Sequence, residues 1–536
     1  MAVPRRGARK IKHMYVQQEQ RPPLAKRIIW HPFLIGFAFI FHFWASAAVH
    51  PLDAMRVLAA GLLGTLLLMY LFRLGLRSWR VAGVATSAVW ALLISQPALR
   101  AVSRAALDAG AWRAIILTLL LMGLAFFLVR GLRRYLRRSQ ALSVITRGLN
   151  GFSFVLVLIV VAQSIIGGNL QTPMRDVGQV VNQFMTKPPS VGSRVPAGPD
   201  IYVFVLDAYA GAETLERYGF DNSPFLTALE QRGFDVASQS RTNYYGTYLT
   251  LASMLNMMPI QDLPQWTEAQ EGNNGLASAF RDAINRNRIF EDLYDYGYRS
   301  AAIANLAPNV ALHGAYDYLD NGALNGFELE VLRSTGLMSL IELVAPDFLG
   351  DQYRNDLTDG LQMTHDLALD RRHRPRLIIS HLISPHSPMV FDAQCGPRSS
   401  ELYDTHEDIM AWLDANLEDN IEQRRQDYVS QTQCLNSLLI PLIDDIIEKS
   451  AEPPVMVLMS DHGPSLSDSP LDWYGNLFAT YTPGHDDLFP EDATPINLFP
   501  TLLNAYLDTD YPLQANVSYR YDAPGKAWVE IPSVAP

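Results

Sequence analysis

The sequence predicts an N-terminal bundle of five transmembrane helices followed by an α/β domain with a mostly parallel central sheet. Three observations predict this architecture. Five apolar stretches follow one another within the first 166 residues, and basic residues gather on alternate loops between them. From Asp200 onward, short continuous apolar strands alternate with helical segments, which is typical of a parallel sheet covered on both faces.

The five apolar stretches have the composition of membrane spans. A hydrocarbon core takes about 20 apolar residues per helix, and several of the stretches need flanking residues to reach that length. One short run could equally be a buried helix of a soluble protein, but five in succession make that alternative poor. We expect spans at Ile28–Val49, Val57–Phe72, Val81–Leu99, Ala114–Val129 and Phe152–Ile166.

The distribution of positive charge predicts the topology. The net charge of -11 conceals an arginine-rich N-terminal part and an acidic remainder. Along the alternating loops, one side carries 17 Lys and Arg residues and the other side four. The positive-inside rule therefore places the N-terminus in the cytoplasm, and five spans place the α/β domain outside. These residues lie beside apolar runs rather than on an aromatic-studded surface, so we expect no nucleic-acid partner.

Composition changes along the chain mark the expected domain boundaries. A long basic tail precedes the first span and no small-residue cleavage site follows it, which excludes a cleaved signal peptide. The stretch before Asp200 is rich in Gly and Pro, as in a linker. We expect a basic tail at 1–27, the spans at 28–168, a linker at 169–199, a catalytic domain at 200–513 and a C-terminal tail at 514–536.

Candidate metal ligands follow the predicted strands. The strands are expected at Ile201–Leu206, Arg299–Asn305, Arg376–Leu382 and Val455–Met459. In open α/β sheets the ligand crevice lies outside the carboxyl ends of the strands. Polar residues occur at or beyond these ends, and each alone could be a helix cap or a surface loop residue. Together they offer oxygen and nitrogen ligands for a divalent metal: Asp207, His386, Asp461 and His462.

Three segments resemble the sulfatase-type alkaline phosphatase superfamily. Asp200–Asp207 resembles its first strand with the terminal acidic ligand, and Ser460–Gly463 resembles its late metal-binding motif. Asn243–Asn256 resembles the nucleophile segment and puts Thr247 at the nucleophile. With its five-helix anchor, the chain is similar to lipoteichoic acid synthases and lipid A phosphoethanolamine transferases. Those enzymes end the first strand in Glu where this chain has Asp207, so the subfamily stays open.

The resemblance implies a set of site residues. Asp207, Thr247, Asp461 and His462 would hold one or two divalent metal ions, zinc or manganese. Metal coordination favours the alkoxide of a Thr hydroxyl, which is otherwise a poor nucleophile. His386 would contact the phosphate or protonate the leaving group. Asn243 and His485 are candidate substrate-binding residues, although His485 is also typical of a solvated loop, and His381 is expected to be a packed structural histidine.

The resemblance also implies a reaction and a place. The residues after Thr247 are Tyr-Leu-Thr-Leu, which lack the pattern required for conversion to formylglycine. We therefore expect a phospho-threonine intermediate and transfer of a phosphoglycerol or phosphoethanolamine-type group. The donor would be a membrane lipid or lipid-linked molecule, and the acceptor a cell-envelope glycan or lipid outside the cytoplasmic (inner) membrane. The alternatives are a hydrolase of sulfuric or phosphoric esters and an inactive envelope sensor or scaffold, which loss of a ligand would favour.

Cys395 and Cys434 are the two cysteines of the sequence. They are too few for a disulfide scaffold and lack the spacing of a structural zinc site. If the domain lies outside the cytoplasm, oxidation to one disulfide is permitted there. Two unpaired thiols remain the alternative.

Overall fold

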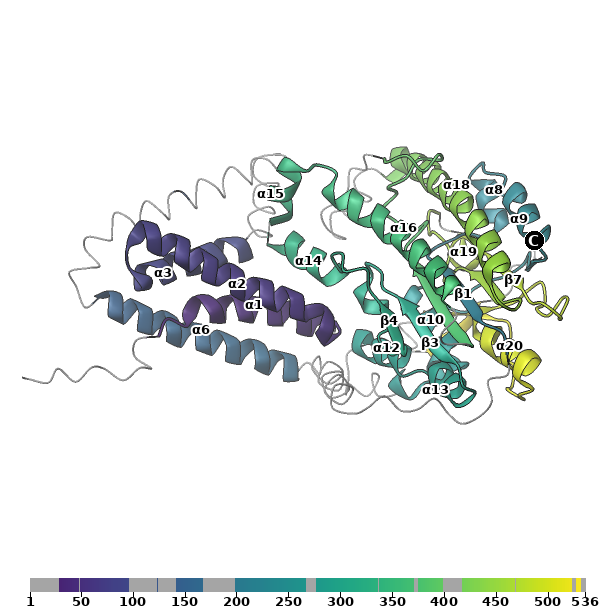
Figure 1. Cartoon of the computed structure of the whole chain (residues 1–536), viewed down its shortest axis with the longest axis horizontal. Helices are drawn as coiled ribbons and strands as arrows, with labels where there is room; N and C mark the ends of the chain where they lie inside the picture. The colour runs from purple at the N-terminus through teal and green to yellow at the C-terminus, as the bar shows by residue number, and fades with distance from the viewer. Residues whose placement is uncertain are drawn as a thin grey trace, which may run out of the picture.

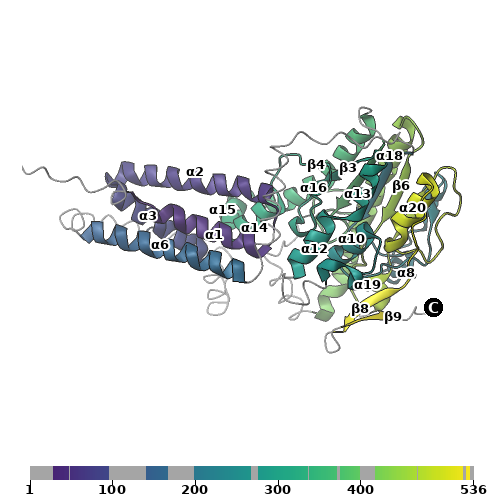
Figure 2. The same cartoon turned by 90° about the horizontal axis from the view of Figure 1, so that it is seen from below.

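The computed structural model describes residues 28–47, 49–95, 123, 141–166, 198–266, 276–335, 337–370, 375–398, 417–467, 469–522 and 527–531. Figure 1 shows two parts along the long axis of the molecule: a bundle of N-terminal helices and a larger α/β domain. A view turned by 90° shows the same division (Figure 2).

Four helices of the N-terminal part are described: α1 (His31–Ala47), α2 (Pro51–Leu76), α3 (Trp79–Ile94) and α6 (Ala141–Ile166). Two segments, Pro51–Leu76 and Leu142–Ile166, are long and apolar enough to cross a membrane, whereas α1 and α3 are shorter apolar helices. Helices thus occupy four of the five expected spans, and Ala114–Val129 lies outside the described residues apart from Gly123. The count of five spans stays a prediction.

The N-terminal helices pack on one another and turn apolar side chains outward. Helix α1 contacts α2, α3 and α6. Trp90 of α3 fits against Gly36 of α1, where a side chain would clash with the indole ring. On the outer face of α2, leucines such as Leu63, at 66% exposure, are left uncovered by the other described helices. Such a surface is typical of helices that face lipid.

The α/β domain is built on a seven-stranded sheet in the order β2-β7-β6-β1-β5-β3-β4. The strands β6, β1, β5, β3 and β4 are parallel, and β7 at one side is antiparallel to both β6 and β2. The sheet is therefore mixed but mostly parallel. Its strands are β1 (Ile201–Leu206), β2 (Asp235–Val236), β3 (Arg299–Ile303), β4 (Asp317–Leu319), β5 (Arg376–Leu382), β6 (Val455–Met459) and β7 (Phe478–Tyr481).

Helices cover both faces of the sheet, which explains why its central strands are apolar throughout. Side chains alternate along β1, so Val203 and Val205 face one core while Phe204 and Leu206 face the other. The first core is completed by α10 (Thr247–Asn256), α12 (Leu276–Asn285), α13 (Arg288–Asp295) and α20 (Leu498–Leu507). The second is completed by α9 (Ser223–Glu230), α16 (Phe348–Leu369) and α18 (Leu417–Lys449).

Shorter elements connect these layers. They include α8 (Ala212–Arg217), α19 (Pro470–Tyr474) and the 3-10 helices η2 (Ile260–Asp262), η3 (Pro308–Val310) and η4 (Pro495–Asn497). Two further helices, α14 (Gly326–Ser334) and α15 (Leu337–Val344), lie between the α/β domain and the helix bundle in both views (Figures 1 and 2).

We expected a C-terminal tail at 514–536, but the structure shows that this region is part of the α/β domain. Its described residues form an antiparallel pair, β8 (Ser518–Asp522) and β9 (Ala527–Ile531). Tyr519 stacks on Tyr244 with ring centroids 5.4 Å apart, and Trp528 meets the same ring edge-on at 5.1 Å. These aromatic contacts bury Tyr244 and make the pair part of the first core, because aromatic packing removes a large apolar area from water.

Candidate metal centre and active site

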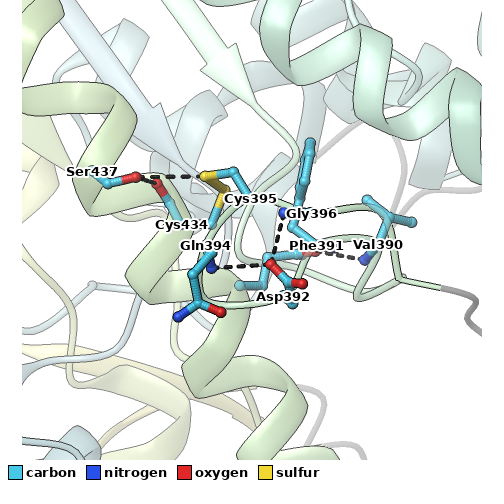
Figure 3. Close-up of a disulfide and its surroundings, with 9 residues drawn as sticks. Val390, Phe391, Asp392, Gln394, Cys395, Gly396, Cys434 and Ser437 are labelled. Atoms are coloured by element: carbon cyan, nitrogen blue, oxygen red, sulfur yellow. Dashed lines mark hydrogen bonds between the residues drawn. A yellow bond between two sulfur atoms is a disulfide. The ribbon is translucent and has the colours of Figure 1, made fainter.

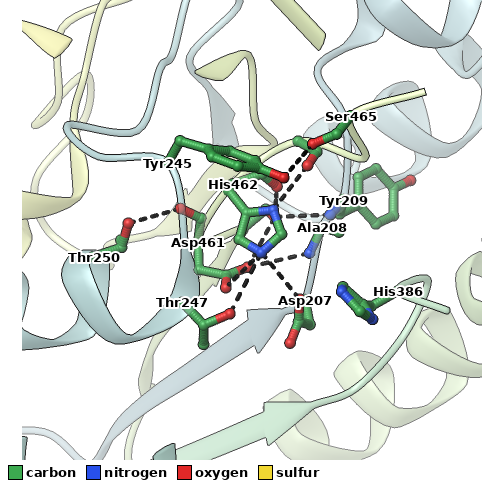
Figure 4. A network of polar contacts seen from close by, with 12 residues as sticks. Asp207, Ala208, Tyr209, Tyr245, Thr247, Thr250, His386, Asp461, His462 and Ser465 are labelled. Carbon is green, nitrogen blue, oxygen red and sulfur yellow. Dashed lines mark hydrogen bonds and ion pairs between the residues drawn. The ribbon is translucent and has the colours of Figure 1, made fainter. Parts of the chain in front are cut away.

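The polar residues predicted from the sequence meet at the carboxyl ends of three neighbouring strands. Asp207 follows β1 and Asp461 lies two residues beyond β6, while His386 follows β5. Because β1 lies between β5 and β6 and all three strands are parallel, these ends meet at one edge of the sheet. Figure 4 shows Asp207, Asp461, His462, His386 and Thr247 converging there.

Thr247 is the first residue of α10 and lies beside this cluster. Its Oγ1 is 3.4 Å from Nε2 of His462. The chain enters the helix through Gly246, whose φ of 124° is a conformation that side-chain-bearing residues rarely adopt. A helix N-terminus also supplies backbone N–H groups and a positive dipole end, both of which favour a bound phosphoryl group.

Thr250, the next threonine of this segment, has a structural role. Its side chain is fully buried. Its hydroxyl lies 2.8 Å from the carbonyl oxygen of Asp461 and 2.9 Å from the hydroxyl of Thr242. These contacts fasten α10 to the loop that follows β6, and the half-buried Thr247 is the accessible hydroxyl at the cluster.

Two overlapping groups of ligand atoms could hold a metal ion. One consists of Asp207, His386 and His462 and the other of Asp207, His381 and Asp461, and within each group the atoms lie within 4.8 Å of one another. Asp207 Oδ1 and Asp461 Oδ2 are buried and accept no hydrogen bond from the described residues, and each lies 3.4–3.5 Å from Nε2 of His462. Buried polar atoms are rarely left unpaired, because desolvation without a partner is costly. Two such carboxylate oxygens fit a divalent cation.

The electrostatics of the cluster point to the same need for positive charge. Burial opposes the ionisation of Asp207, but the charge of His386 and the hydrogen bond from His381 outweigh it and hold its pKa below the usual range. Burial likewise opposes protonation of His462, yet Asp461 and Asp207 raise its pKa above the ordinary value. The two carboxylates thus attract positive charge to the site, which a bound cation would supply.

His381 is not merely a packed structural histidine, as the sequence led us to expect. Its Nε2 lies 3.2 Å from Asp207 Oδ2, and its Nδ1 lies 3.0 Å from the side-chain nitrogen of Asn305. The Asn305 oxygen accepts from the backbone N–H of Ala307, so its amide nitrogen faces the ring and donates to Nδ1. The neutral ring then carries its proton on Nε2 and donates it to Asp207, which leaves Oδ1 of Asp207 facing the cluster.

The loop that carries His386 is fastened to α18 at two points. The buried side chain of Gln431 accepts from the backbone N–H of Val390 at 2.7 Å and donates to the carbonyl oxygen of His386 at 3.1 Å. Three residues further along α18, Cys434 is joined to Cys395 by a disulfide with an S–S distance of 2.06 Å (Figure 3). His386 itself is exposed, with its ring 6.0 Å from that of His462.

The two predicted substrate-binding residues, Asn243 and His485, lie where they would not contact a substrate at the cluster. Asn243 is fully buried, and its amide bonds the backbone N–H of Ile496 and the carbonyl oxygen of Val517. It positions the nucleophile segment and cannot reach a substrate. His485 follows β7, which runs antiparallel to β6, so it lies toward the opposite edge of the sheet from Asp461. Its ring packs against Tyr506 at 4.7 Å.

The sheet is mostly parallel, and a threonine at a helix start and a carboxylate–histidine cluster meet at the ends of its strands. The model of the sulfatase family matches residues 201–505, which is more than half of the chain. The chain therefore belongs to the sulfatase family and is a sulfatase-like hydrolase or transferase. No curated protein sequence matches the chain.

Several solved structures are similar to this one. The C-terminal periplasmic domain of EcEptC from Escherichia coli in complex with Zn has a TM-score of 0.41 at 14% identity, covering 64% of this chain and 96% of that one. The integral membrane protein lipooligosaccharide phosphoethanolamine transferase A from Neisseria meningitidis has a TM-score of 0.35 at 16% identity, covering 74% and 70%. The periplasmic domain of the phosphoethanolamine transferase EptC from Campylobacter jejuni has a TM-score of 0.36 at 14% identity, covering 58% and 90%.

Proposed function

We propose that the chain is a membrane-anchored, metal-dependent phosphotransferase that acts through a phospho-Thr247 intermediate. It would move a phosphoglycerol or phosphoethanolamine-type group from a membrane lipid to a cell-envelope glycan or lipid, outside the cytoplasmic membrane. One observation supports this most directly. The accessible hydroxyl of Thr247 begins α10 and lies 3.4 Å from His462, beside buried carboxylate oxygens of Asp207 and Asp461 that accept no hydrogen bond from the described residues.

The residues have distinct roles in the proposed reaction. Asp207, Asp461 and His462 would hold a divalent cation, zinc or manganese, which supplies positive charge and makes a coordinated hydroxyl easier to ionise. Thr247 Oγ1 attacks phosphorus in line, and the bond from phosphorus to the lipid oxygen breaks. His386 gives a proton to that departing oxygen. An acceptor hydroxyl then gives its proton to His386 and attacks phospho-Thr247, the new ester bond forms, and the threonine oxygen leaves and takes back from water the proton that it lost when it attacked.

The chemistry of Thr247 favours phosphoryl transfer over sulfate ester hydrolysis. Threonine cannot become formylglycine, and the residues that follow it here are Tyr-Leu-Thr-Leu. A phosphate ester hydrolase is the second candidate, and the match to the sulfatase family favours it. The two reactions differ only in the acceptor, because in the hydrolase water would replace the hydroxyl of a glycan or lipid in the second step. The long apolar helices α2 and α6 favour the transferase, since they would keep the domain beside a lipid-borne donor.

The experiment is intact-mass analysis of the purified protein after incubation with zinc and vesicles of phosphatidylglycerol or phosphatidylethanolamine. We expect a covalent phosphoglycerol or phosphoethanolamine adduct that peptide mapping places on Thr247, and whichever vesicle produces it identifies the donor. Thr247→Ala should abolish the adduct, whereas the matched control Thr250→Ser should keep it. An adduct that persists in Thr247→Ala would refute the nucleophile assignment.

A further inference from the structure

Helix α15 of the α/β domain is apolar on two opposite faces. Its sequence, Leu337–Val344, contains a single charged residue. On one face, Met338 is buried against Leu329 of α14 and Leu349 of α16. A helix that packs through one apolar face normally carries few apolar side chains elsewhere. Here Leu337, Leu340 and Val344 lie outside the packed face.

The outward face of α15 is only partly covered by the described residues. Leu337, Leu340 and Val344 follow one another at the spacing of a single helix face, opposite Met338. Leu337 and Leu340 are partly exposed, and Val344 is 82% exposed, the most exposed large hydrophobic side chain of the described α/β domain. A contiguous apolar surface of this kind marks a contact with a partner or a membrane.

The helix before α15 connects this surface to the helix bundle. Phe327 of α14 is buried in one cluster with Phe39 and Ile40 of α1 and Val57 of α2, and Val331 packs against the same cluster. Both views show α14 and α15 beside the end of the bundle nearest the α/β domain (Figures 1 and 2). Helix α14 thus joins α15 to the helix bundle, in which α2 turns leucines outward.

Polar contacts fix this arrangement at the N-terminal end of α2. Arg56 donates to the carbonyl oxygen of Ala323 at 2.7 Å and pairs with Glu328 at 2.8 Å. Asp53 accepts from His313 at 2.7 Å. Several charge-assisted bonds at one boundary define the orientation of α14 and α15 better than a single pair could.

We propose that α15 is an interfacial helix that lies in the outer leaflet of the membrane, with Leu337, Leu340 and Val344 facing the acyl chains. The partner is the lipid bilayer itself, and the inference rests on the proposed function in assuming that α2 spans the membrane. Helices with an apolar face enter the boundary between headgroups and acyl chains. The α/β domain would then be held at the membrane by two elements, α2 and α15, with its active site at a fixed height above the lipid surface.

The test measures immersion depth by spin labelling of the full-length protein in phosphatidylethanolamine–phosphatidylglycerol vesicles. Single cysteines are introduced as Val344→Cys, Leu63→Cys and Leu513→Cys, and the native Cys395–Cys434 disulfide does not react with the label. Leu63 lies on the outer face of α2. Leu513 is 61% exposed and follows α20, which Figure 1 shows on the side of the α/β domain away from the helix bundle. Each label is relaxed in turn by oxygen, which concentrates in lipid, and by a water-soluble nickel chelate.

We expect the labels at 344 and 63 to be relaxed more strongly by oxygen and the label at 513 more strongly by the chelate. If the label at 344 reports water, as the label at 513 does, while the label at 63 reports lipid, the inference is overturned and the membrane anchor stands. If the label at 63 also reports water, the anchor itself is wrong. Leu340→Cys is a second probe on the same face and should agree with Val344→Cys if the latter fails to express.

Discussion

Replacing Gln431 by leucine should impair the active site through the loop that carries His386. The side chain is 1% exposed and accepts from the N–H groups of Val390 at 2.7 Å and Phe391 at 3.3 Å. It also donates to the carbonyl oxygens of Pro385, His386 and Pro388. Leucine keeps the volume and removes every one of these bonds. A buried N–H without a partner costs about 1–3 kcal/mol, so we expect the free energy of unfolding to fall by that amount.

The effect on turnover separates a positioning role from a general loss of stability. General acid catalysis contributes about 100-fold or more, so Gln431→Leu should lower kcat by at most the factor lost in His386→Ala. When one residue acts through another, the effects of their substitutions on kcat do not add. In the His386→Ala background, Gln431→Leu should therefore leave kcat on a soluble phosphodiester unchanged while the urea midpoint still falls. Gln426→Leu, an exposed site on the same helix, is the matched control. Equal fold-losses of kcat in both backgrounds would refute the positioning role.

Two further predictions concern the metal cluster and the disulfide. Asp461→Asn should lower bound metal and turnover together, whereas Thr247→Ala should retain most of the metal but lose turnover. Elemental analysis and a phosphodiester assay of both variants distinguish these outcomes. Full metal content in Asp461→Asn would exclude Asp461 as a ligand. The Cys395→Ser/Cys434→Ser variant should unfold at lower urea, because a bridge across 39 residues stabilises by about 4 kcal/mol in the chain-entropy account. An unchanged midpoint in non-reducing buffer would show that the native thiols are not bridged.

The central strands could be predicted from the sequence because burial on both faces leaves an unbroken apolar run. The expected bounds of Ile201–Leu206, Arg376–Leu382 and Val455–Met459 agree with the structure. Strand β3, expected at Arg299–Asn305, ends at Ile303. The clustering of Asp207 with Asp461 followed from the rule that parallel strands present their carboxyl ends at one edge. Short elements gave no such signal, since β2 has two residues and the β8–β9 pair packs through aromatic side chains that could equally belong to a loop.

The supporting residues of the site could not be predicted, because tertiary packing alone brings them to it. Gln431 lies 45 positions from His386 and Asn305 lies 76 positions from His381, and neither occurs in a recognisable motif. His381 had one usable signal, a titratable side chain inside an otherwise apolar strand, which we assigned to packing. The misplacement of His485 has a physical cause too. Its strand reverses direction, and a run as short as Phe478–Tyr481 does not reveal its orientation.

One cavity is lined both by the helix bundle and by a residue that contacts His381. Asp53 of α2 and Asn305, the residue that donates to His381, both line it, together with Asp356 of α16. Burial raises the pKa of Asp356 to about 7, despite an opposing effect from the charge of His381. Because protein interiors are close-packed, a shift of the α/β domain on α2 would move the cavity wall that holds Asn305, and with it His381 and Asp207. The helix bundle is therefore part of the surroundings of the active site as well as its tether.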